Sequence, residues 1–177
     1  MRVISGIARG HKLISLEGDL TRPTTDRVKE AMFSIIQMNI AGSVVLDMFA
    51  GSGALGIEAL SRGAVWCDFV ENNKQASVVI QKNIEKTKMK DVSVLHNSTA
   101  HSFAERCNKK YDVVFLDPPY NKGLCEEAMS LLKEYDLLND GAIIVCEASA
   151  GETINSTYPE KKQAKYGNTK LVIFENR

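Results

Sequence analysis

Residues 44–60, VVLDMFAGSGALGIEAL, indicate which kind of fold this chain adopts. The apolar run 44–46 ends in an acid, Asp47, and passes through the small-residue turn 50–53 into apolar residues at helical spacing. The pattern predicts a strand, a glycine turn and a helix. Glycines let the backbone approach a ligand closely, and the first turn of a helix offers unpaired N–H groups. The stretch therefore predicts a site for a nucleotide-type cofactor.

The same stretch contains the pattern G-x-G-x-x-G, through Gly51, Gly53 and Gly56, and an acid, Glu71, follows about twenty residues later. Enzymes that use NAD and enzymes that use S-adenosylmethionine (SAM) both fit this spacing. Asp47 favours SAM, because an acid at the tip of a strand suits an α-amino group and a sulfonium better than a pyrophosphate. The carboxylate of Glu71, at the tip of the next strand, can accept hydrogen bonds from both ribose hydroxyls.

The composition predicts one globular domain without covalent staples. The chain has 177 residues, of which 44% are hydrophobic, enough to bury a core. Its four cysteines contain no C-x-x-C pair, so neither a zinc site nor a disulfide framework is indicated, and we expect no metal. No apolar run has the length of a membrane span and no signal peptide is recognisable, so we expect a cytoplasmic protein.

The basic residues are concentrated near the N-terminus. Residues 1–29 hold six of the 22 Lys/Arg but three of the 22 Asp/Glu. Residues 2–8 and 12–16 are predicted to form a short hairpin, and a polar segment then leads into a helix that begins near residue 25. We expect residues 1–24 to be an RNA-binding arm on a core formed by 25–177. Its candidate contacts are Arg9, Lys12, Arg22, Thr24, Thr25 and Arg27.

Strands and helices alternate along the rest of the chain. Strands are predicted at 65–70, 92–96, 111–116 and 142–146, with helices near 73–88 and 124–133, a short helix after the polar turn 97–100 and a turn at 139–141. Residues 161–166 and 169–174 flank a Gly-Asn turn and predict a closing hairpin. The fold class is therefore α/β, with a seven-stranded, mostly parallel sheet and an antiparallel C-terminal hairpin. Its ligand crevice should lie at the C-terminal ends of the strands.

The tetrapeptide Asp117-Pro118-Pro119-Tyr120 follows the strand predicted at 111–116. Prolines donate no backbone hydrogen bond, so this turn presents only acceptors, the two carbonyls and the carboxylate. Such a surface suits an NH₂ group, because two N–H bonds held by acceptors can turn the nitrogen lone pair toward an electrophile. The ring of Tyr120 could stack on a base. The tetrapeptide therefore predicts chemistry on an exocyclic amine.

These motifs carry a family resemblance. The stretch 47–64 together with Asp-Pro-Pro-Tyr resembles class I SAM-dependent methyltransferases with a Rossmann-like sheet. The segments RVISGIARGHKL, TRPTTDRVKEAMF and YGNTKLVIFE narrow the resemblance to the RsmD family, which methylates N2 of a guanine in 16S ribosomal RNA. The resemblance covers nearly the whole chain. It implies SAM as cofactor and 16S ribosomal RNA as substrate, within the small subunit or an assembly intermediate.

The resemblance also implies roles for individual residues. Asp47 and the backbone of Phe49, Ala50, Gly51, Ser52 and Gly53 would hold the methionine part of SAM, and Glu71 with Asn72 the ribose. Ser98, Thr99 and Ala100 would lie along the adenine, although many related enzymes have an acid where Thr99 stands. Asp117 to Tyr120 would position the target amine.

Other functions fit parts of the pattern. A methyltransferase for an adenine or cytosine amine of DNA, or for a protein glutamine, shares both motif centres, although the glutamine enzymes usually have Asn at the position of Asp117. An NAD-dependent oxidoreductase fits the glycine turn alone. An RNA-binding assembly factor without catalytic activity would need neither motif centre intact.

Overall fold

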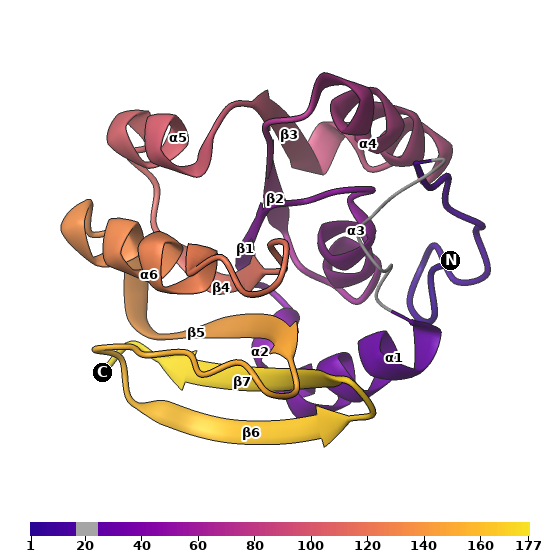
Figure 1. The fold of residues 1–177 in the computed structure, drawn as a ribbon. Helices are drawn as coiled ribbons and strands as arrows, with labels where there is room; N and C mark the ends of the chain where they lie inside the picture. Colours follow the sequence, from indigo (N-terminus) through magenta and orange to yellow (C-terminus); the bar gives the residue numbers. More distant parts are fainter. Residues whose placement is uncertain (17–24) are drawn as a thin grey trace.

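A single twisted sheet forms the centre of the molecule. The computed structural model describes residues 1–16 and 25–177, and within them seven strands pair in the order β3-β2-β1-β4-β5-β7-β6 (Figure 1). The first five strands in that order are parallel, and β7 is antiparallel to both of its neighbours. The order reverses between β1 and β4, and a crevice at the carboxyl ends of these strands is the usual ligand site of such a sheet.

Each strand and helix has defined bounds. The elements are α1 (Asp26–Ile35), α2 (Gln37–Ile40), β1 (Val44–Met48), α3 (Ala54–Ser61), β2 (Trp66–Glu71), α4 (Lys74–Lys86), a short 3₁₀ turn (Lys90–Val92), β3 (Ser93–Asn97), α5 (Ala100–Arg106), β4 (Tyr111–Leu116), α6 (Leu124–Glu134), β5 (Leu138–Ser149), β6 (Glu160–Tyr166) and β7 (Thr169–Glu175). The seven strands predicted along the core and the C-terminal hairpin are all present. No helix in the described part of the chain is long and apolar enough to cross a membrane.

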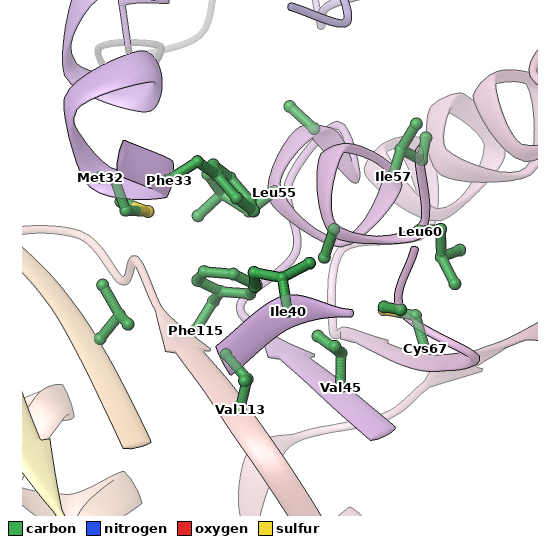
Figure 2. Close-up of a cluster of buried hydrophobic side chains, with 14 of the residues drawn as sticks. Met32, Phe33, Ile40, Val45, Leu55, Ile57, Leu60, Cys67, Val113 and Phe115 are labelled. Carbon is green, nitrogen blue, oxygen red and sulfur yellow. The ribbon is translucent and has the colours of Figure 1, made fainter. Parts of the chain in front are cut away.

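Helices cover both faces of the sheet. The side chains of α1 to α4 pack on one face, and those of α5 and α6 pack on the other (Figure 1). Adjacent residues of β1 divide between the two cores, because side chains alternate across a strand. Val45 lies with Phe33 and Phe115 in the first core, where the two rings are 5.5 Å apart (Figure 2), and Leu46 lies in the second. The central strands are therefore buried on both sides.

Gly56 allows α3 to lie directly against β2. A Cβ atom at this position would be 2.3 Å from Phe69 Cε1 and 2.6 Å from Cys67 Sγ, distances that real Cβ atoms do not show. The third glycine of G-x-G-x-x-G thus serves close packing of helix on strand, as it does in dinucleotide-binding folds. This packing sets where the glycine turn at the start of α3 lies.

The turn predicted at 139–141 is wrong, because these residues belong to β5. Tyr111 of β4 pairs with Leu138 of β5, whereas Val113 pairs with Ile143, so β5 carries extra residues opposite Asp112. A glycine bulge absorbs them, since Gly141 has a φ of 75°. The strand continues through the turn signal because the residues on either side of it, Leu138 and Ile143, both pair with β4.

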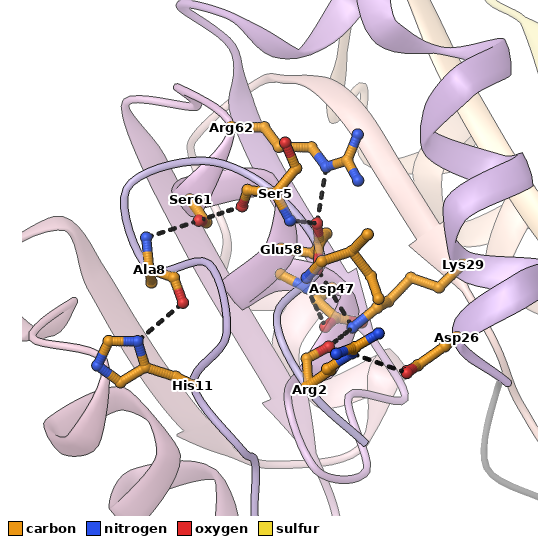
Figure 3. A network of polar contacts seen from close by, with 12 residues as sticks. Arg2, Ser5, Ala8, His11, Asp26, Lys29, Asp47, Glu58, Ser61 and Arg62 are labelled. Atoms are coloured by element: carbon orange, nitrogen blue, oxygen red, sulfur yellow. Dashed lines mark hydrogen bonds and ion pairs between the residues drawn. The ribbon is translucent and has the colours of Figure 1, made fainter.

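The N-terminal hairpin is present, but it is shorter than the sequence predicts. The segments pair around one antiparallel bridge, between Arg2 and Lys12, and backbone hydrogen bonds join residues 1–3 to residues 10–13. The N–H groups of Ile4 and Ser5 instead donate to the carboxylate of Glu58 on α3, at 2.9 and 3.0 Å (Figure 3). Backbone donors near a buried surface need partners, and this loop finds them on the helix. Residues 3–8 are therefore packed on the core, and the role of residues 1–24 as an RNA-binding arm stays a prediction.

A second set of contacts joins the N-terminal loop to the end of α3. The N–H of Ala8 donates to Ser61 Oγ at 3.0 Å, and that hydroxyl donates to the carbonyl of Ser5 at 2.6 Å (Figure 3). A Cβ atom on Gly6, whose φ is 86°, would overlap the carbonyl oxygen of Ser61. Only glycine permits this close approach of loop and helix.

Candidate active site

A cavity of about 1170 Å³ lies at the C-terminal ends of β1, β2 and β4. It brings together both motif centres of the sequence. The predicted residues that line it are Asp47, Phe49, Ala50, Gly51, Ser52, Glu71, Asn72, Ser98, Thr99, Ala100, Asp117, Pro118, Pro119 and Tyr120. Gly53 is absent from the lining. It precedes α3 with a φ of 80°, and its N–H donates to the carbonyl of Ala50. Gly53 therefore closes the turn without facing the cavity.

The backbone turns sharply directly after β1. Phe49 has a φ of 66°, in the left-handed region that non-glycine residues rarely adopt. Conformations of this kind cost about 1–3 kcal/mol and persist where the surroundings enforce them, often at functional sites. Here the left-handed conformation of Phe49 directs the chain from β1 into the glycine turn that lines the cavity.

Asp47 is buried at the tip of β1, with 1% of its surface exposed. Its Oδ2 accepts a hydrogen bond from the N–H of Gly56 at 2.8 Å, so the carboxyl group satisfies one of the unpaired donors in the first turn of α3. Burial raises the pKa of Asp47 to about 8, and the charge of Glu71 acts in the same direction. A cation bound at this wall of the cavity would favour the ionised carboxylate.

Glu71 ties the end of β2 to the glycine turn. Its two oxygens accept the N–H groups of Gly51 and Asn73, each at 2.8 Å. A carboxylate offers about four lone-pair sites, so both oxygens keep acceptor capacity toward the cavity. The predicted contact with ribose hydroxyls stays a prediction, and the structure adds a second role as a brace of the turn.

The turn after β3 carries the residues predicted for the adenine. Thr99 is the N-cap of α5, because its Oγ1 accepts the N–H of Ser102 at 3.1 Å. The hydroxyl of Ser98 donates to the carbonyl of Thr99 at 3.0 Å. Both hydroxyls thus support the local turn at the rim of the cavity. Their contact with an adenine stays a prediction.

The Asp-Pro-Pro-Tyr loop crosses from β4 toward β5. Tyr120 is half-buried, and its hydroxyl donates to Glu147 Oε1 at 2.9 Å and lies 3.4 Å from Thr169 Oγ1. Burial raises the pKa of Tyr120 strongly, and the negative charges of Glu147 and Asp117 add to the effect although Thr169 opposes it. The phenol therefore keeps its proton and acts as a donor. Sequence analysis missed Glu147, because nothing in its local pattern distinguishes it from other strand residues.

The predicted RNA contacts are distributed along the N-terminal region. Arg9, Lys12 and Arg27 are exposed, and Thr25 caps α1 by accepting the N–H of Val28 at 3.3 Å. The other two residues of that prediction, Arg22 and Thr24, lie outside the described residues. Met1, Ser15 and Leu16 reach the wall of the cavity, so the N-terminal segment adjoins the site.

A buried ion pair anchors this segment and was missed by sequence analysis. Lys29 of α1 and Glu58 of α3 are both fully buried, with Nζ and Oε2 3.2 Å apart, and Glu58 also accepts Arg62 Nε at 2.7 Å (Figure 3). Burial lowers the pKa of Lys29, and the charge of Glu58 opposes that shift. An acid within an otherwise apolar helix is the one sequence signal that points to Glu58.

A further unpredicted residue, Asn83 of α4, joins the N-terminal segment to the glycine turn. Its Nδ2 donates to the carbonyls of Ile14 and Ser52, each at 2.9 Å, and its Oδ1 accepts the N–H of Ile14 at 2.8 Å. The side chain is fully buried. It therefore holds the start of the chain beside the cavity.

The strand order, the glycine turn after β1, the acid that ends β2 and the Asp-Pro-Pro-Tyr loop after β4 together define a class I methyltransferase. The model of the family described as "Conserved hypothetical protein 95" matches residues 1–175. The chain belongs to this family, which is the RsmD family, and the predicted family and fold class are confirmed.

Individual known proteins agree with this assignment. Ribosomal RNA small subunit methyltransferase D from Haemophilus influenzae is 41% identical over 150 residues, which cover 83% of this chain and 78% of the relative. The solved structure of yhhF from Escherichia coli matches with a TM-score of 0.88 at 35% identity. The match covers 100% of this chain and 98% of the yhhF chain. An RNA methyltransferase from Salinibacter ruber, solved with S-adenosyl-L-homocysteine, shares the fold with a TM-score of 0.68 at 15% identity, over 88% of this chain and 94% of its own.

Proposed function

We propose that this methyltransferase uses SAM to methylate the N2 amine of a guanine in small-subunit ribosomal RNA. The observation that carries the proposal is that one cavity is lined both by the glycine turn with Glu71 and by the Asp-Pro-Pro-Tyr loop. A cofactor site and an amine-binding loop thus face the same space. The relative from Haemophilus influenzae, named as a small-subunit ribosomal RNA methyltransferase, supports the substrate class.

The polar groups of the cavity fit SAM. Asp47 is a buried carboxyl group whose ionised form gains from a nearby cation, and SAM offers both an ammonium and a sulfonium. Glu71 supplies acceptor oxygens for a ribose diol, and the glycine turn lets the backbone approach. The donor set therefore matches the charged and polar parts of this cofactor.

The protein contributes position and electrostatic field. SAM, when bound, supplies a methyl group on a sulfonium, which is already a strong electrophile. Asp117 accepts an N–H of the target amine, and the proline carbonyls that follow add acceptors, so the nitrogen lone pair faces the methyl group in line. Asp117 need not act as a base, because the amine becomes strongly acidic when it is methylated and loses its proton readily.

The guanine has to leave its stack to reach the cavity. This costs least in a single-stranded loop, and Tyr120 offers an aromatic face on which the base can stack. The exposed Arg9, Lys12 and Arg27, together with Arg22, are the proposed contacts to RNA phosphates. We further propose that the substrate is the small ribosomal subunit or an assembly intermediate, which would place the protein in the cytoplasm.

Mass spectrometry of ribosomal RNA tests the proposal. RNA from a strain that lacks the protein should be missing one N2-methylguanosine, and purified protein with SAM should restore it. The matched control is the Asp117→Ala protein, which should restore little. If the modified nucleosides of the two strains are the same, the proposed substrate is wrong.

A further inference from the structure

We propose that Glu147, assisted by Thr169, is a positioning residue that fixes the ring of Tyr120 where the target base stacks. The proposal rests on the proposed function, since it concerns the aromatic face offered to the guanine. Neither residue touches the base in this assignment. Both act through the phenol hydroxyl of Tyr120.

The two positioning groups come from adjacent strands. Glu147 lies near the C-terminal end of β5, and Thr169 begins β7, where it pairs with Ser149 of β5. The hydroxyl of Tyr120 donates to Glu147 Oε1 at 2.9 Å, and Thr169 Oγ1 is 3.4 Å away. The loop that follows β4 is thus connected through a side chain to the rim formed by β5 and β7.

The burial of Glu147 argues for a specific role. Only 3% of its surface is exposed, and taking a carboxylate out of water costs several kcal/mol that good hydrogen bonds must offset. A buried acid at this place is a poor way to gain stability, because an apolar side chain of similar size serves packing better. It is a good way to hold a hydroxyl in one direction, because hydrogen bonds to charged groups are short and strong.

The backbone beside Tyr120 is held separately. Glu152 Oε1 accepts the N–H of Asn121 at 3.1 Å, and Asn121 adopts a φ of 58°. These contacts fix the loop but leave the two side-chain torsions of Tyr120 to be set. The hydrogen bonds to Glu147 and Thr169 act on the far end of that side chain, where they have the greatest leverage on the ring.

Packing alone does not hold the phenol. A second cavity, of about 180 Å³, lies beside the contact and is lined by Glu147 and Thr169 together with Thr25, Val28, Tyr166, Gly167 and Asn168. That space admits several water molecules. Tyr120 itself lines the first, larger cavity, so a ring without its hydroxyl anchor would have room to move on that side. Because burial raises the pKa of Tyr120, the phenol remains a donor throughout the working pH range.

The test compares Tyr120→Phe, Glu147→Leu, Glu147→Gln and the double variant Tyr120→Phe/Glu147→Leu. Methyl transfer to ribosomal RNA gives kcat and KM, and calorimetry gives the SAM affinity. We expect each of Tyr120→Phe and Glu147→Leu to lower kcat about tenfold, with SAM affinity unchanged within about twofold. The double variant should be no worse than either single variant, because both remove the same hydrogen bond. Glu147→Gln keeps an acceptor and should retain at least a third of the parental kcat.

Several outcomes would overturn the proposal. Additive losses in the double variant would show that Glu147 acts independently of Tyr120, and a parental kcat in Tyr120→Phe would show that the anchor is not needed. Tyr120→Phe removes one oxygen, so it keeps the test decisive even where Glu147→Leu fails to fold. Glu175→Gln, at the other end of β7, is the matched control and should leave kcat unchanged. A parental protein that methylates no guanine would instead reject the proposed function.

Discussion

At the level of single residues, Asp117 separates turnover from cofactor binding. It lines the same cavity as Glu71 but belongs to the loop that we propose to hold the target amine. Asp117→Ala should lower kcat on the order of 10² or more, because it removes an orienting hydrogen bond, while SAM affinity stays within a few fold. Single-turnover methyl transfer and calorimetry measure the two quantities, with the exposed Asp140→Ala as control. A kcat close to that of the parent would remove Asp117 from the proposed mechanism.

Asp47 should make cofactor binding depend on pH. Its pKa is raised to about 8, so in the free protein at pH 6 the carboxyl group is mostly protonated. A bound cation favours the ionised form, so binding must expel that proton below pH 8. SAM affinity should therefore rise with pH, by up to about tenfold per unit, and level off above about pH 8.

Calorimetry in buffers of different ionisation enthalpy checks the release of this proton. Asp47→Asn should bind SAM more weakly at pH 8 and lose most of the pH dependence. Asp140→Asn, an exposed acid on β5, should keep both. A parental affinity that does not change between pH 6 and 8 would mean that Asp47 does not ionise on binding.

Among the helices and strands, the packing of α3 on β2 controls the glycine turn. Gly56→Ala would put a methyl group 2.3 Å from Phe69 Cε1, so the helix would have to move outward. We expect a loss of about 1–3 kcal/mol in the free energy of unfolding, the range for overpacked cores, together with weaker SAM binding. Urea denaturation measures the first effect. Gly151→Ala, with no atom within 4 Å of its added Cβ, is the control and should change neither quantity.

Across the molecule as a whole, the N-terminal segment supplies positive charge beside an acidic cavity. Its backbone donors hold it on α3, so the exposed side chains of Arg9 and Lys12 can be removed without releasing it. The Arg9→Ala/Lys12→Ala variant should bind RNA more weakly. Its slope of log affinity against log salt should be shallower by about 0.7–0.9 for each phosphate that the variant no longer neutralises. SAM affinity should not change.

Binding isotherms over a range of salt concentrations test this prediction. Lys162→Ala/Lys165→Ala, which removes two exposed lysines of β6, is the matched control for the removal of two positive charges. If the control variant loses as much salt dependence as the N-terminal variant, the RNA surface extends over the sheet edge. If only the control loses it, the N-terminal assignment is wrong.

Local patterns predicted the sheet and the cavity well. The apolar runs of β1, β2, β4 and β7 fall where the structure has strands. A buried strand is recognisable because its hydrophobic pattern lies in neighbouring residues of the sequence. The two motif centres were placed in one crevice because the carboxyl ends of parallel strands meet at one edge. Of the residues predicted for the cofactor, Gly53 alone does not line the cavity, because it ends the turn at the start of α3.

The alternation of strands and helices, the glycine turn and the Asp-Pro-Pro-Tyr loop could all be predicted from the chain alone, since each is a property of neighbouring residues. How these parts are braced depends on the packing of distant elements. Glu58 receives the N-terminal loop, and Glu147 receives Tyr120 from 27 residues away. Such partners share no local pattern, and a buried polar group takes whichever donor the tertiary structure brings to it. For the same reason the N-terminal hairpin is shorter than propensity predicts, because the backbone donors of Ile4 and Ser5 bind Glu58 on α3.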